Sequence, residues 1–247
     1  MASNWEIKQF RLTIFPHKSY KAPSKALWPA SSKFVLEKQT SQSKTGETIL
    51  EGKHQKNRVV LSITPIRISL SLSPEQEIAF NPPSVVTLGK FDDNLTLIHQ
   101  IATEWSQAKA FPETKRVAFG AVPLKPVKNT VEGYKLLNKY LPFKLDGKKT
   151  SDFLHQINIP TKSKIIKNLA INRLSKWSVL RLTTKMSTIQ ETSSEYKYPD
   201  IFLVSLELDV NTAKEFSGKF EKKQTTALFG ELLDLGKELC EKGIRAK

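Results

Sequence analysis

Cysteine is nearly absent from the sequence, since Cys240 is the only one among 247 residues. One thiol cannot form an intramolecular disulfide or a thiolate metal cluster, and such usage is typical of a reducing compartment, so we expect a cytoplasmic protein. Glycine is also sparse, and the ten glycines never gather into a Rossmann or Walker phosphate loop. No GxSxG elbow accompanies the serines, so acyl-enzyme chemistry has no support.

Long apolar runs are missing as well. No stretch approaches about eighteen uninterrupted apolar residues, the length of a membrane-spanning helix. Residues 1–12, MASNWEIKQFRL, contain no apolar core of a secretory signal. We therefore expect neither secretion nor a membrane partner.

The residues that usually carry catalysis or bind metals form no recognisable arrangement. The four histidines lack HExxH or any other ligand spacing; they are His17, His54, His99 and His155. The aspartates nearest the basic segments form no converging carboxylate set of the kind a metal nuclease needs. We expect no catalytic residue, no metal and no cofactor, and one enzymatic alternative stays open: metal-independent RNA cleavage with His155 as general base.

Positive charge is what the sequence has in excess. Lysine and arginine together number 39 against 24 acidic residues, for a formal net charge of +15. A charge of this size attracts polyanions, so nucleic acid is the first candidate partner. Lysine is the commoner base, and scattered lysines also serve simply to solvate a surface.

The residues from Thr161 to Lys185 contain seven basic side chains and no acidic one. In their second half Trp177, Val179 and Arg181 share one phase of a strand, which predicts a cationic surface that carries a large aromatic ring. Trp177 is the candidate for stacking on an unpaired base. The candidate phosphate contacts are Lys162, Lys164, Lys167, Arg173, Lys176, Arg181 and Lys185, and a second basic segment adds Lys18, Lys21 and Lys25.

Alternating apolar and polar residues predict strands over much of the chain, most clearly at 66–73, IRISLSLS, and 201–210, IFLVSLELDV. Helical spacing predicts helices from Asp92 or Asp93 to Lys109, over 131–141 and over 225–242. The last of these presents Leu228, Leu232, Leu235 and Leu239 along one face.

Helices that follow groups of strands indicate an α+β fold, mainly antiparallel, with the C-terminal helix packed on the sheet. We expect one compound domain over residues 1–247. The prolines near 74–90 allow a subdivision into a β-rich part, 1–73, and an α+β part, 91–247.

From Leu88 onward the order of the predicted elements resembles a known family. The resemblance rests on the Trp105-bearing helix, RVAFG at 116–120, LELDV at 206–210 and the closing leucine-rich helix. The family is a sporadically distributed bacterial one of similar length, without an assigned activity. It implies a cytoplasmic prokaryotic protein from a mobile or antiviral-defence gene set, and it supplies no functional residues.

Two classes of function remain open. One is a non-catalytic nucleic-acid-binding or accessory subunit that acts through the basic, tryptophan-bearing surface. The other is a protein-interaction subunit in which Trp177, Trp28 and apolar loops contact a partner and the charge only solvates the surface.

Overall fold

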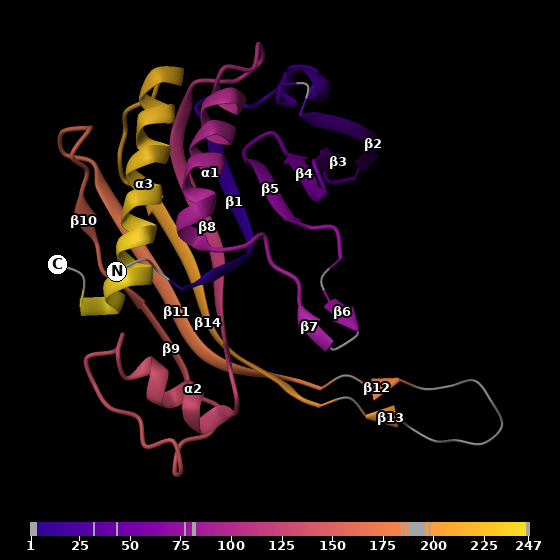
Figure 1. The fold of residues 1–247 in the computed structure, drawn as a ribbon. Helices are drawn as coiled ribbons and strands as arrows, with labels where there is room; N and C mark the ends of the chain where they lie inside the picture. Colours follow the sequence, from indigo (N-terminus) through magenta and orange to yellow (C-terminus); the bar gives the residue numbers. More distant parts are fainter. Residues whose placement is uncertain are drawn as a thin grey trace.

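A computed structural model describes residues 4–31, 33–42, 44–76, 78–80, 83–183, 185–186, 196–197 and 199–245. Its centre is a ten-stranded antiparallel sheet in the order β10-β11-β14-β8-β1-β5-β4-β3-β2, with β9 also paired to β11 (Figure 1). The strands are β1 Glu6–Pro16, β2 Phe34–Gln42, β3 Glu47–His54, β4 Asn57–Ile63, β5 Ile68–Pro74, β8 Thr114–Val127, β9 Leu154–Asn158, β10 Thr161–Lys162, β11 Ala170–Leu182 and β14 Ile201–Thr212.

Two short hairpins extend from this sheet. They are β6 Ile78–Phe80 with β7 Pro83–Val85, and β12 Lys185–Met186 with β13 Tyr196–Lys197. The polar sequence from Ser187 to Pro199 predicts a loop, and most of this segment lies outside the described residues. Strands from both sides of the 74–90 segment belong to the one large sheet, because β1 pairs with β5 on one side and with β8 on the other.

Three α-helices lie on one face of the sheet and leave the other face open (Figure 1). They are α1 Phe91–Ser106, α2 Thr130–Leu137 and α3 Lys222–Lys242, and two 3-10 turns, Ser24–Leu27 and Gly243–Arg245, complete the chain. The predicted α+β class with a C-terminal helix on the sheet is therefore confirmed. Among the described residues, no helix has the length and apolarity needed to cross a membrane.

The helix termini differ in detail from the prediction. Helix α1 is capped by Lys90, so Asp92 and Asp93 lie in its first turn, where their charge favours the positive end of the helix. In α2 the Asn129 side chain accepts the N–H of Glu132 at 2.9 Å. The spacing of Asn129 and Glu132 predicts a capping box, but the box is incomplete, because the Glu132 carboxylate accepts the N–H of Lys128 instead.

Helix α3 packs on the sheet through the predicted leucine stripe. Leu228, Leu232 and Leu239 are buried, whereas Leu235 is only half-buried at the rim of the contact. Gly236 lets the helix approach the sheet closely, since a Cβ there would lie 2.9 Å from the Phe119 ring.

The four tryptophans all belong to the core. Trp177 is 0% exposed on the helix-covered face of β11, with its ring stacked on Tyr140 at 5.5 Å and edge-on to Trp5 at 6.1 Å. Its indole N–H is satisfied by the Ser175 hydroxyl at 3.0 Å. The expectation of an aromatic ring exposed on a cationic surface is wrong, because the face of β11 that carries Trp177 is the one the helices cover.

Candidate nucleic-acid interface

One end of the large sheet gathers four connecting segments that are distant in sequence. Antiparallel pairing brings four strand termini to this end of the sheet: the end of β1, the start of β8, the end of β14 and the start of β11. Backbone hydrogen bonds join the segments: His17 to Glu113 at 2.9 Å, Thr114 to Phe220 at 3.0 Å and Ala213 to Ala170 at 2.8 Å. We call residues 17–25, 107–115, 161–170 and 213–223 the basic end.

The basic end carries most of the protein's net charge. Its segments contain three glutamates, no aspartate and no arginine, against twelve lysines, so it contributes nine of the fifteen net positive charges. All twelve lysines are exposed. They are Lys18, Lys21, Lys25, Lys109, Lys115, Lys162, Lys164, Lys167, Lys214, Lys219, Lys222 and Lys223.

Few of these ammonium groups are neutralised within the chain. Lys219 pairs with Glu113 at 2.6 Å, and its hydrogen bond holds the pKa of the Glu113 carboxyl below its usual value. Lys222 donates to the carbonyl of Ala108 at 3.0 Å. In the described part of the chain, the other ten lysines have no ion pair, so their charge is free to attract an anion.

The loop between β10 and β11 presents its lysines outward because its inner side is anchored. The Glu231 carboxylate of α3 accepts the Ser163 hydroxyl at 2.6 Å and also the N–H of Lys164. Asn168 adopts the left-handed conformation, with φ at 64°, and Leu169 inserts into the core. The side chains of Lys164 and Lys167 therefore project into solvent on an anchored turn.

The other predicted contact residues lie away from this end. Arg173 is 3% exposed, donates to the carbonyl of Ile159 at 2.9 Å and faces Glu238 at 3.6 Å, so burial keeps its guanidinium from phosphate. Arg181 pairs with Asp200 at 2.6 Å on the long β11–β14 hairpin. The side chain of Lys185 lies outside the described residues.

Six lysines of the predicted set meet at the basic end, and six further ones were missed. Lys162, Lys164 and Lys167 lie about four strand positions from the Lys18 to Lys25 loop. The missed residues lie in segments that also contain acids, such as Glu215 and Glu221, so no acid-free run marked them. The antiparallel order of the strands could have indicated these lysines, because in such a sheet every second loop along the chain lies at the same end of the sheet.

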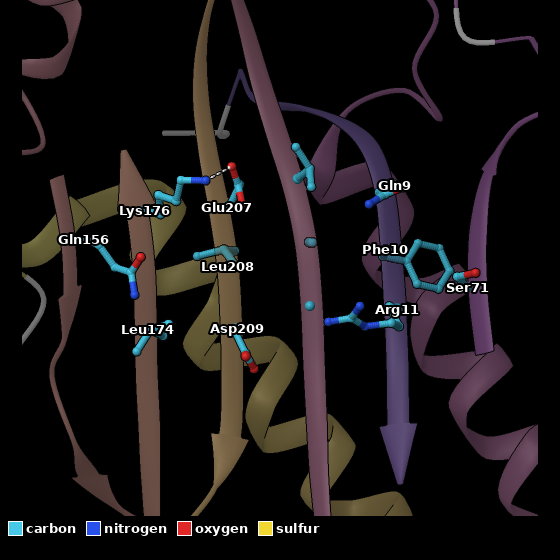
Figure 2. Close-up of a pocket in the computed structure, with 13 residues that line it drawn as sticks. Gln9, Phe10, Arg11, Ser71, Gln156, Leu174, Lys176, Glu207, Leu208 and Asp209 are labelled. Atoms are coloured by element: carbon cyan, nitrogen blue, oxygen red, sulfur yellow. Dashed lines mark hydrogen bonds and ion pairs between the residues drawn. The ribbon is translucent and has the colours of Figure 1, made fainter. Parts of the chain in front are cut away.

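The open face of the sheet carries a shallow hollow of about 560 Å³. Lys176 pairs with Glu207 at 2.7 Å (Figure 2). In the same view the Arg11 side chain extends from β1 toward β8, and Asp209 lies on β14, on the other side of β8. Two cations and two carboxylates balance one another there. Lys176 therefore belongs to a neutral patch, which has no electrostatic preference for a polyanion.

The histidines are dispersed in the structure, as they are in the sequence. Within the described ranges, no three or more histidine, cysteine, aspartate or glutamate side chains come together as metal ligands would. His155 lies on the helix-covered face of β9, against Phe143 at 5.2 Å between ring centres. Its Nε2 is buried without a hydrogen-bond partner among the described residues, and it is remote from the basic end.

Comparison with known proteins adds nothing to this geometry. No protein-family model matches the chain, and no curated protein matches it.

Proposed function

We propose that the protein binds nucleic acid through the basic end, by contacts to the phosphate backbone and without catalysing a reaction on it. The observation that carries the proposal is the concentration of nine net positive charges on four joined segments, with ten lysines unpaired among the described residues. Polyanions release counterions when such a surface binds them, and this release drives association.

The chemistry of the side chains favours binding that does not depend on base sequence. All the cations of the basic end are lysines, which act as point charges on flexible stems and lack the planar fork with which arginine reads guanine. The N-terminus of α3 also lies here, but Glu221 and Gln224 already cap it reciprocally. The ammonium groups, rather than helix amides, are therefore the phosphate ligands.

The aromatic residues of the basic end are unsuited to stacking on bases. Phe216 is stacked on Phe220 at 5.2 Å, Phe111 and Phe220 are buried, and Tyr20 packs against the core with its hydroxyl buried. The exposed large apolar side chains near this end are aliphatic: Ile165 belongs to the basic end, and Ile66 lies in the turn whose Pro65 carbonyl accepts the N–H of Tyr20. Contacts to phosphates rather than stacking on unpaired bases should therefore dominate, and a duplex should bind at least as tightly as a single strand of equal length.

The breadth of the lysine array fits several phosphates at once. Strands β10 and β1 are four positions apart in the sheet, which at about 4.8 Å per position spreads the flanking loops over about 19 Å. Phosphates along one DNA strand follow at about 3.4 Å of helix rise. The array can thus contact several phosphates of one nucleic-acid molecule.

The salt dependence of binding tests the proposal. The affinity for a fluorescent DNA duplex of arbitrary sequence is measured by anisotropy at several salt concentrations, for the parent chain and for a variant with Lys21, Lys167 and Lys223 changed to Gln. If all three contact phosphate, the slope of log affinity against log salt should fall by about 2 to 3, since each contact contributes about 0.9.

A matched control variant distinguishes binding at the basic end from a general effect of the protein's net charge. Lys128, Lys139 and Lys144 are exposed lysines elsewhere on the molecule, and changing them to Gln removes the same charge. This control should leave the slope nearly unchanged. Equal effects of the two triple variants, or no binding by the parent at low salt, would refute the proposed function.

A further inference from the structure

The outer edge of β9 is an unpaired sheet edge. Among the described residues, strand β9 pairs only with β11, and β10 continues along the same side of β11 (Figure 1). Unpaired edges present rows of N–H and C=O groups that accept a further strand. The residues of β9 lie outside the basic end, and an inference from this edge does not depend on the function proposed above.

The register shows which backbone groups point outward. Ile159 donates its N–H to the carbonyl of Arg173, directly opposite it, so this is a hydrogen-bonded pair. Such pairs alternate along an antiparallel ladder, so the N–H and C=O groups of Leu154, Gln156 and Asn158 face away from β11. No backbone partner for these three residues occurs among the residues that the structure describes.

The two edges of the sheet are protected to different degrees. Strand β2, at the far edge, carries Glu37 and Lys38, and its pairing with β3 is interrupted by a register shift between Leu36 and Lys38. Charges and bulges of this kind deter strand addition. Strand β9, LHQIN, has neither a charge nor a register shift.

Exposed apolar side chains gather beside the β9 edge. Leu154 is 59% exposed, and Leu180 on the open face of the neighbouring β11 is 37% exposed. Phe143, 39% exposed, lies against His155 on the helix-covered face. A strand added to β9 would cover part of this apolar surface on both faces of the sheet.

We propose that β9 pairs antiparallel with β9 of a second copy of the chain, about a two-fold axis at Gln156. Outward-facing residues then meet one another, Leu154 opposite Asn158 and Gln156 opposite its own copy, for about six intermolecular backbone hydrogen bonds. Strand β9 contains no lysine, arginine, aspartate or glutamate, so no like charges face each other across the paired residues. The result is one continuous sheet from two protomers.

The charge distribution favours this arrangement over a parallel one. An antiparallel junction has its two-fold axis perpendicular to the sheet, so the two basic ends point in opposite directions. Each carries nine net positive charges, and placing them side by side would cost repulsion. A second copy of this strongly basic chain is therefore accommodated here without bringing the lysine arrays together.

The mass in solution and a single-site crosslink test the proposal. Light scattering after size exclusion should give twice the 28.0 kDa of one chain. Opposed residues at the axis have Cα atoms about 5.5 Å apart, within disulfide range, so Gln156→Cys should form a covalent dimer on mild oxidation. The native Cys240 is buried and does not interfere.

Proline substitution then identifies the edge. Gln156→Pro removes an N–H that points away from β11, so the fold should persist, while dimer affinity should fall about tenfold or more because two hydrogen bonds at the axis are lost together. Gln156→Ala keeps that N–H and should keep the dimer. A monomer at every concentration would overturn the proposal and assign the edge to a strand of a different protein, and a dimer unaffected by Gln156→Pro would overturn it too.

Discussion

Replacing Trp177 by alanine should destabilise the protein and leave the binding of each folded molecule unchanged. The side chain is 0% exposed and lies between Trp5 and Tyr140, so truncation opens a large cavity in the centre of the core. Buried Trp to Ala changes typically cost about 3 to 5 kcal/mol. The Ser175 hydroxyl, which is also buried, loses its indole partner, which favours the upper part of that range.

Urea unfolding followed by circular dichroism measures this cost. Trp177→Phe is the graded control, because it keeps a ring against Tyr140 and should cost about half as much or less. The salt slope for duplex DNA, corrected for the folded fraction, should equal that of the parent. A loss of stability below about 1 kcal/mol, or weaker binding by fully folded Trp177→Ala protein, would refute the placement of this ring in the core.

Two further predictions follow from burial. Gly236→Ala should lower the urea midpoint, since the added methyl group would lie 2.9 Å from the Phe119 ring and push α3 off the sheet, and an unchanged midpoint would contradict the close approach. Burial lowers the pKa of His54 below its usual value of about 6.5, so the unfolded chain takes up a proton at higher pH than the folded chain does. The parent should therefore lose stability relative to His54→Gln as the pH falls below about 6.5, with a constant difference above pH 7, and a difference that stays constant throughout would count against this assignment.

Local patterns predicted the elements well and their surroundings less well. The alternation at 201–210 predicts β14 correctly, although Leu203 and Ser205, in the phase of the polar residues, are buried as well. Ile66 shares the phase of Ile68, yet it lies in the turn before β5 and is 69% exposed, since phase does not show where pairing begins. For Trp177 the pattern gave the correct partners in phase, but which face of β11 the helices cover depends on packing between distant segments.

The candidate site shows the same limit. Lys162, Lys164 and Lys167 were recognisable because no acid interrupts their segment. Lys214 and Lys219 join them only through the antiparallel order of β11, β14 and β8, which is a property of the whole sheet. A local reading of charge therefore detects half of the lysine array.

The contact between Trp5 and Cys240 has a consequence for how the chain folds. The indole N–H of Trp5, just before the first strand, donates to the carbonyl of Cys240, in the last helix, at 2.8 Å. Between them β1 must also pair with β8, about a hundred residues later. Both edges of β1 can therefore pair once β8 has been synthesised, but the core around Trp5 is completed only when α3, more than a hundred residues after β1, has also been synthesised. Folding should accordingly be slow and dependent on chaperones that shield the incomplete core.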